Sequence, residues 1–299
     1  MEIPLYQEIR DGAPVSLLMH LAVWRVTGPD RERWLNGQVT NQVKGLAPGA
    51  TVRAAVCSSK GRMQGDVWIT EHKDAYWVTA RAGLREVLGP RLDQYLIADD
   101  CELTDVTDDW EVWCQFNGGS PGGVSDGFRT ANPFRFGGPS ADLFLPRGTD
   151  TSALADPREA RDAAEALRLE HALPMWGAEL NEKTLPPEAG FDRFGISYTK
   201  GCYIGQETIA RLRSVGHVNR HLCCLSGRDQ NITPGDELEA DGRKVALVTS
   251  VSYSPQLEAT LALAYVKRRL MEPGTSLDLD GAPWTVVPPP LALEEVAAL

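Results

Sequence analysis

Apolar and polar residues alternate over several short stretches in the first part of the chain, a pattern typical of strands that bury one face. Residues 51–70, TVRAAVCSSKGRMQGDVWIT, contain two such runs on either side of Lys60-Gly61, which predicts a β-hairpin. A further strand is expected at 75–80, AYWVTA. In the second strand of the hairpin, every other residue falls on one side: Met63, Gly65, Val67 and Ile69.

Apolar residues at helical spacing predict three helices. The first is short and covers 29–37. The second lies within 83–97, where leucines recur every four residues and Pro90 must start or kink the helix. The third covers 156–173, with Asp156 as the N-cap and a proline at the first helical position.

From His221 onward the pattern changes to short alternating strands, which predicts a small all-β unit at the C-terminal end. Within it, residues 239–255 are expected to form a hairpin that turns at Asp241-Gly242. One side of its second strand would carry Val245, Leu247, Thr249 and Val251. The glycine-rich stretch 117–127 matches no phosphate-binding spacing and is expected to be a linker or a surface turn.

A length of 299 residues exceeds the size at which one core stays compact, so two or three packed units are expected. The formal net charge of -11 argues against a general nucleic-acid binder, which needs a basic face. The start lacks a basic segment followed by a long apolar run, and no stretch of about 18 apolar residues occurs. We therefore expect a cytoplasmic protein with neither membrane nor nucleic acid as a partner.

Six cysteines are spread along the chain without a CxxC pair, which favours free thiols in a reducing compartment over a disulfide framework. His217, His221, Cys223 and Cys224 do not predict a metal site, because H-x3-H in an extended strand places the two rings about 13 Å apart. No metal ligands are therefore assigned. The sequence also lacks a nucleophilic-serine elbow, a P-loop and a dinucleotide fingerprint.

The segment KGCYIGQETIAR, residues 200–211, concentrates reactive and flexible residues. Cys202 follows Gly201 and lies close to Lys200, whose charge would favour the reactive thiolate. Gly201 and Gly205 leave the backbone open to close approach of another group. The alternative is a small buried side chain, as most lone cysteines are, and the residues alone support the two about equally.

Two glutamates and a basic run are further candidates. Glu170, near the end of its helix, and Glu188, in a proline-bounded turn, could each accept paired N–H donors from a heterocycle such as a pterin. Glu170 is favoured for function because it follows an apolar face, whereas Glu188 is favoured as a solvated charge. Between Lys200 and Arg220 four basic residues face one acidic residue, so an anionic ligand would be drawn here, although a solvated strand face is at least as common.

Taken together, residues 200–207, KGCYIGQE, resemble the KGCYxGQE signature of the YgfZ family, the folate-binding relatives of the glycine-cleavage T-protein. The similarity extends over most of the chain, through VTGPDRERWLNGQVTNQV with SSKGRMQGDVWI, LRLEHALPMWGAEL with PPEAGFD, and PGDELEADGRKVALVTSVSYSPQLEATLALAYV. The resemblance implies an α+β, three-domain, T-protein-like ring around a folate-holding channel. Its domains would be 1–47 with 151–215, an inserted 48–150, and a C-terminal β-barrel domain at 216–299.

The resemblance also implies a role for the protein and for its residues. It implies a monomer that supports assembly or repair of iron–sulfur proteins and binds tetrahydrofolate or a one-carbon-substituted reduced folate. Glu170 would hydrogen-bond the pterin, Cys202 and Lys200 would lie at the mouth of the ligand site, and Asp66 joins them as a catalytic candidate. Further cofactor-binding residues are assigned to the motif and the basic run after it: Tyr203, Gln206, Glu207, Arg211 and Arg213.

Two other functions stay open on the sequence. The T-protein's catalytic aspartate belongs to a neighbouring acidic pair, and this chain has Gly65-Asp66 there, which keeps one carboxylate and leaves aminomethyl transfer open. Against that function, the thiol motif marks the YgfZ branch, and methylene transfer has no evident need for a thiol. A folate-dependent demethylase that acts with an oxidase would need a separate subunit, because this chain has no dinucleotide fingerprint.

Overall fold

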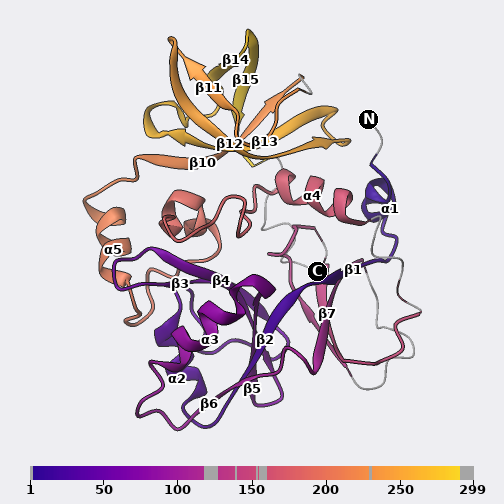
Figure 1. The fold of residues 1–299 in the computed structure, drawn as a ribbon, viewed down its shortest axis with the longest axis vertical. Coiled ribbons are helices and arrows are strands. Elements are labelled where there is room, and N and C mark those ends of the chain that lie inside the picture. Colours follow the sequence, from indigo (N-terminus) through magenta and orange to yellow (C-terminus); the bar gives the residue numbers. More distant parts are fainter. Residues whose placement is uncertain are drawn as a thin grey trace.

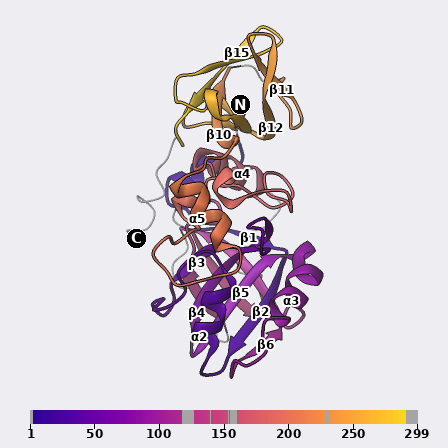
Figure 2. The same cartoon turned by 90° about the vertical axis from the view of Figure 1, so that its left-hand side faces the viewer.

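The computed structural model describes residues 3–117, 127–138, 140–152, 154, 160–228 and 231–289. They form two β-sheets and a closed barrel (Figure 1). The barrel lies at one end of the molecule and the sheets at the other, and the helices α4 (Ala160–Glu170) and α5 (Gln206–Ser214) lie between them (Figure 2). The predicted α+β class with a C-terminal barrel is confirmed.

The five-stranded sheet has the order β3-β4-β5-β2-β6 with antiparallel pairing throughout. The predicted hairpin is confirmed, because β3 and β4 pair along their length with a bulge near Cys57. β2 pairs with β5, so this sheet contains strands from both sides of the expected domain boundary at residue 47. The strand bounds are β2 Leu21–Thr27, β3 Thr51–Cys57, β4 Met63–His72, β5 Ala75–Arg81 and β6 Glu102–Asp105.

Two helices pack on one face of this sheet, α2 (Arg31–Gln38) and α3 (Arg85–Asp93), the latter preceded by the short 3₁₀ helix η1 (Ala82–Leu84). Pro90 lies inside α3, and the helix ends several residues earlier than the leucine spacing predicted. Close packing also explains a glycine in β4: a Cβ on Gly65 would lie 2.8 Å from Leu88 Cδ1.

The four-stranded sheet has the order β1-β7-β9-β8 and is covered by α1 (Tyr6–Arg10) and α4. Small alanines on the inner face of α4 let the helix approach the sheet closely. The predicted start of this helix at Asp156 and most of the predicted loop 117–127 lie outside the described residues. The strand bounds are β1 Val15–Met19, β7 Trp110–Phe116, β8 Phe128–Ala131 and β9 Ser140–Pro146.

The C-terminal unit is a closed barrel with the order β10-β13-β12-β11-β14-β15. The predicted hairpin through Asp241-Gly242 is confirmed, but its sidedness is wrong: Leu247 is 41% exposed, and the buried side continues through Ala246 and Val248. A register shift at Leu238/Glu239 places adjacent residues of β12 inward and moves the alternation by one residue. The bounds are β10 Arg220–Gly227, β11 Glu237–Ala240, β12 Arg243–Ser254, β13 Ala259–Lys267, β14 Ser276–Leu279 and β15 Ala282–Val287.

The segment between α4 and the barrel contains α5 and two single-turn 3₁₀ helices, η2 (Pro186–Ala189) and η3 (Phe191–Arg193). A further 3₁₀ turn, η4 (Arg268–Leu270), follows β13. Among the described residues, every helix is too short or too polar to span a bilayer.

A buried ion-pair network joins α4 to the barrel. Arg168 of α4 is 1% exposed, and its Nη1 donates to Glu179 Oε2 at 2.9 Å and to the Leu173 carbonyl at 2.6 Å. Its Nη2 donates to Glu165 Oε1 at 2.6 Å and to Ser250 Oγ of β12 at 2.8 Å. The Ser250 hydroxyl in turn donates to Glu179 Oε1. One guanidinium therefore fixes the helix, the segment after it and the barrel in one arrangement.

We predict that Arg168→Met lowers the free energy of unfolding by roughly 3–5 kcal/mol, because it leaves the buried Glu179 carboxylate without its cation. Urea unfolding followed by circular dichroism measures the change. Arg211→Gln is the matched control, since Arg211 pairs with Glu207 on the solvent-exposed face of α5 and should cost at most about 0.5 kcal/mol. A loss below about 1 kcal/mol for Arg168→Met would show that the network does not hold the units together.

Candidate functional site

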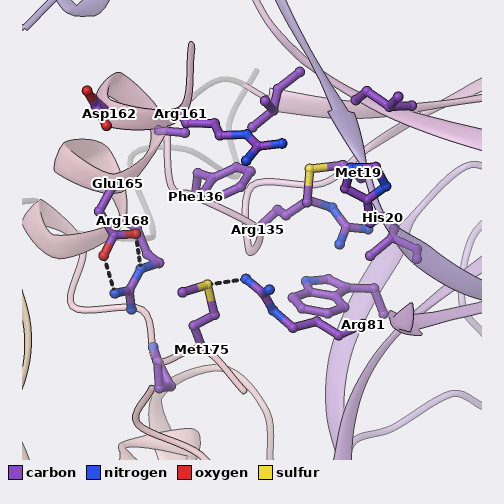
Figure 3. Close-up of a pocket in the computed structure, with 16 residues that line it drawn as sticks. Met19, His20, Arg81, Arg135, Phe136, Arg161, Asp162, Glu165, Arg168 and Met175 are labelled. Atoms are coloured by element: carbon purple, nitrogen blue, oxygen red, sulfur yellow. Dashed lines mark hydrogen bonds and ion pairs between the residues drawn. The ribbon is translucent and has the colours of Figure 1, made fainter. Parts of the chain in front are cut away.

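A cavity of about 360 Å³ lies between α4 and the sheets, beside the ends of β1 and β5 and the middle of β4 (Figure 3). Its walls combine aromatic and thioether groups with several arginines. The aromatic and thioether lining comes from Trp68, Phe136, Met19 and Met175. The cationic lining comes from Arg81, Arg135, Arg161 and Arg168. A ligand with a flat ring system and negative charge fits this combination of groups.

The four arginines fall into two pairs. Arg135 and Arg168 are buried, and each is neutralised, Arg135 by Asp142 and Arg168 by its glutamates. Arg81 and Arg161 are exposed and lie on opposite walls, at the end of β5 and in the first turn of α4 (Figure 3). Within the described part of the chain, neither of these two forms an ion pair with a carboxylate. The exposed pair therefore leaves positive charge available to a ligand.

Trp68 of β4 forms part of the cavity wall between two guanidinium groups. The carbon atoms at the centres of these groups lie 4.8 Å (Arg53) and 4.3 Å (Arg135) from the indole centroid. Each arginine is neutralised in turn, Arg53 by Asp66 and Arg135 by Asp142. This alternation of charges and an aromatic ring holds Trp68 in one orientation.

Asp66, one of the predicted catalytic residues, lies behind this wall. Its side chain is fully buried, and Arg53 Nη2 donates to its Oδ2 at 2.5 Å. The same guanidinium donates to the Pro174 carbonyl at 2.6 Å. Asp66 is not among the residues that line the cavity, and a catalytic role for it stays a prediction.

Glu170 closes the last turn of α4 against the barrel. It is fully buried, and its Oε1 accepts hydrogen bonds from the Tyr6 hydroxyl at 2.6 Å and from the Ser254 hydroxyl. Burial, together with the neighbouring Glu170 carboxylate, raises the pKa of Tyr6, so the phenol stays a donor. Glu170 does not line the cavity, and its predicted contact with a pterin stays a prediction.

Lys200 holds the KGCYIGQE motif against the end of α2. Its Nζ donates to the carbonyl oxygens of Asn36, Val39 and Asn41 at 2.5, 2.8 and 2.7 Å. Burial lowers the pKa of Lys200 to about 7. These three carbonyls accept the N–H donors of Lys200, so its amino group is directed at the backbone of residues 36–41 and not at Cys202. Cys202 itself is exposed, and its predicted reactivity stays a prediction.

The glycine of the motif at position 205 meets the turn of the first hairpin. Gly205 has φ +86°, and a Cβ there would lie 2.5 Å from the Ser58 carbonyl oxygen. On the other side of this contact, a Cβ on Gly61 would lie 2.9 Å from Thr208 Cβ. The two glycines therefore let the motif and the hairpin turn pack directly against each other.

The remaining predicted cofactor-binding residues are placed around α5 and not around the cavity. Tyr203 is 8% exposed and packs in an apolar cluster below the motif. Gln206 starts α5, and its side-chain amide lies 3.5 Å from the Gly201 carbonyl. Glu207 and Arg211 pair at the surface, and Arg213 lies 3.8 Å over the ring of Tyr198. The structure thus brings these residues together with one another and with Cys202, but not with the cavity arginines.

The cavity arginines were not predicted from the sequence. One readable signal was the seven-residue spacing of Arg161 and Arg168, which places both on one face of a helix. Arg81 ends a strand and Arg135 lies in a turn, so neither has a local pattern that marks it as part of a site. They meet α4 only through packing of the sheets.

Two family models match this chain. The GCVT N-terminal domain matches residues 6–115, and the glycine cleavage T-protein C-terminal barrel domain matches residues 220–292. The second match covers the barrel described above, and the first covers most of the two sheets. The chain belongs to the GcvT family of T-protein-like proteins.

Relatives within this family carry more than one name. The tRNA-modifying protein YgfZ of Aliivibrio fischeri (strain MJ11) is 28% identical over 302 residues, covering 94% of this chain and 93% of its own. The aminomethyltransferase of Thermoanaerobacter sp. (strain X514) is 22% identical over 316 residues, covering 92% and 83%. Mouse mitochondrial dimethylglycine dehydrogenase is 33% identical over 141 residues, and the match spans 16% of that longer protein.

The fold also matches a solved structure. The glycine cleavage system aminomethyltransferase T from Bartonella henselae superposes with a TM-score of 0.76 at 17% sequence identity, covering 97% of this chain and 90% of that one. The likeness shows that the present chain has the GcvT-like fold with its C-terminal barrel.

We predict that iodoacetamide at neutral pH modifies Cys202 before the other five cysteines, because Cys202 is the exposed thiol. Burial raises the pKa of Cys57 and Cys224 to about 12 and of Cys101 and Cys223 to about 11, and it raises that of Cys114 as well. Peptide mass mapping over time measures the order of modification.

Cys202→Ser is the control for this experiment. It should remove the fast phase of labelling and change the free energy of unfolding by less than about 0.5 kcal/mol, as expected of a surface position. Modification of Cys202 last, together with a clear loss of stability in Cys202→Ser, would contradict an accessible thiol.

Proposed function

We propose that this protein binds a reduced folate in the arginine-lined cavity and supports the assembly or repair of iron–sulfur proteins, with Cys202 as its reactive group. The observation that carries the folate part is the cavity itself, where aromatic and thioether groups stand beside two exposed arginines. Tetrahydrofolate combines a flat pterin and an aminobenzoyl ring with the carboxylates of glutamate. Members of the GcvT family bind this cofactor in general, which supports the assignment.

The residues present suit such a ligand. Trp68 and Phe136 offer apolar ring surface, and the buried arginines behind them are already neutralised, so a neutral ring is not penalised there. Arg161, exposed in the first turn of α4, offers a bidentate donor to a carboxylate at the mouth. In a protein with a net charge of -11, this local positive charge gives an anionic ligand a favourable place.

The iron–sulfur part of the proposal rests on the motif. KGCYIGQE presents an exposed thiol on a loop that Lys200 and Gly205 fix to the rest of the protein. A fixed, exposed thiol is suited to contact with a partner protein. We assign the client class by resemblance of this motif to the YgfZ family. The relatives called tRNA-modifying proteins span the same length of chain, but the acidic net charge here argues against direct binding of RNA.

The second candidate is aminomethyl transfer of the glycine cleavage T-protein type. The aminomethyltransferase match over 92% of this chain favours it. Where the T-protein has a pair of neighbouring acidic residues, this chain keeps one carboxylate, Asp66. It is fully buried and paired with Arg53. Asp66 also does not line the cavity, so a ligand bound there would not contact this carboxylate directly. We therefore rank this function second.

We predict that 5-formyltetrahydrofolate, a stable reduced folate, binds with saturable heat in titration calorimetry, and that Arg161→Gln weakens binding by roughly 1.5–3 kcal/mol. The affinity should also fall with rising ionic strength, because the contact is charged. Arg211→Gln is the matched control on α5. If Arg211→Gln loses as much affinity as Arg161→Gln, the carboxylate site would lie on α5, in the basic run that the sequence indicated. Absence of saturable heat in the unchanged protein would overturn folate binding.

The role of the thiol gives a separate prediction. Cys202→Ser should bind 5-formyltetrahydrofolate as the unchanged protein does, yet fail to restore iron–sulfur enzyme activity in cells that lack the native protein. An assay for formaldehyde and aminomethyl turnover with tetrahydrofolate should show none. Turnover that survives in Cys202→Ser and disappears in Asp66→Asn would favour the aminomethyltransferase.

A further inference from the structure

A groove away from the arginine-lined cavity is strongly basic. It measures about 770 Å³ and lies where the connection from α5 to β10 meets the end of β13, lined by residues 217–220, residues 267–269 and Glu188. The two segments are held side by side, because the Arg268 N–H donates to the Asn219 carbonyl at 3.0 Å. Packing therefore joins the basic run around α5 to a second basic segment that is distant in the sequence, in a protein whose net charge is -11.

The positive charges in this basic groove differ in how they are neutralised. Arg220 is held in place, because its Nη2 lies 3.5 Å from Glu188 Oε2 and its guanidinium carbon lies 4.3 Å from the ring centroid of Tyr265. Arg268 and Arg269 are exposed, and within the part of the chain that the structure describes neither forms an ion pair with a carboxylate. These two guanidinium groups are therefore available to carboxylates of a partner.

An apolar side chain next to the basic groove indicates the kind of partner. Val215, two residues before His217 of the groove, is 87% exposed. A protein partner gains free energy by burying such a side chain within a rim of charged contacts. RNA would use the charges but not the valine, and its phosphates beyond the groove would meet an acidic protein. The surface therefore favours an acidic protein segment over RNA.

The basic groove also lies within reach of the thiol. It follows the C-terminal end of α5, whereas Cys202 precedes the other end, and a helix of nine residues is about 14 Å long (Figure 2). We propose that the basic groove, with Val215 beside it, binds an acidic segment of the protein partner on which Cys202 acts. The inference rests on the proposed function and adds the surface that recognises the partner and the charge of the segment that it takes.

The direct test uses a short fluorescein-labelled peptide in which glutamates flank a leucine, with binding followed by fluorescence anisotropy. The unchanged protein should bind it saturably, and more weakly as salt rises, but should not bind the same peptide with glutamine for glutamate. Arg268→Gln/Arg269→Gln should weaken binding about tenfold or more, because two charge-assisted contacts are lost. Val215→Ser should weaken it several-fold. Arg25→Gln/Lys73→Gln, which removes two exposed charges from the five-stranded sheet, is the matched control and should change nothing.

Equal affinities of Arg268→Gln/Arg269→Gln and the control, or no saturable binding of the acidic peptide, would overturn the inference. So would tighter binding of a single-stranded RNA of the same charge, which would assign the groove to nucleic acid. Thermal unfolding of each variant shows that the fold is kept.

A second measurement separates this inference from the proposed function. In cells that lack the native protein, Arg268→Gln/Arg269→Gln should fail to restore iron–sulfur enzyme activity, while the purified variant binds 5-formyltetrahydrofolate as the unchanged protein does. Full restoration by this variant would overturn the docking surface and leave the proposed function standing. If the unchanged protein itself restores no activity, the proposed function fails, and the inferred partner fails with it.

Discussion

The arrangement of this protein depends on one buried cation. Arg168 reaches from α4 to the Glu179 carboxylate and to the Ser250 hydroxyl of the barrel, and all three groups are removed from water. Removing charges from water is costly unless each finds its partners, so only the observed arrangement of helix, connecting segment and barrel satisfies them together. The same contacts fix Met175 and the α4 wall, which means that the cavity takes its shape from this network.

Charge is distributed in the cavity by depth. The deeper arginines, Arg53 and Arg135, pair with carboxylates and lie over the ring of Trp68, so their contacts stabilise the fold. The exposed arginines at the ends of β5 and α4 are left without carboxylates among the described residues. Such an arrangement leaves two exposed arginines at the mouth, above a floor whose arginines are all paired with carboxylates, which suits a ligand with a neutral ring and a charged tail.

The KGCYIGQE motif combines structural residues with a candidate reactive one. Lys200 binds three carbonyls, Gly205 permits a close backbone contact, and Tyr203 packs in an apolar cluster. Cys202, in the middle of these residues, stays exposed. The neighbours of the thiol therefore have steric and hydrogen-bonding roles in the fold, while the thiol itself is exposed, as the proposed chemistry with a partner requires.

The sequence by itself determined the elements whose patterns are local. Period-two alternation gave the β3–β4 hairpin and the strands of the barrel, and helical spacing gave α2, α3 and the body of α4. Motif resemblance indicated the YgfZ branch, of which the broader GcvT family and the T-protein-like fold are shown. Tertiary structure alone decided the buried side of β12, because a bulge shifts its register. It also decided the position of Arg81 across the cavity from α4, because packing of separate elements brings together residues that are distant in the chain. Local periodicity carries no information about such contacts, so the cavity could not be read from it.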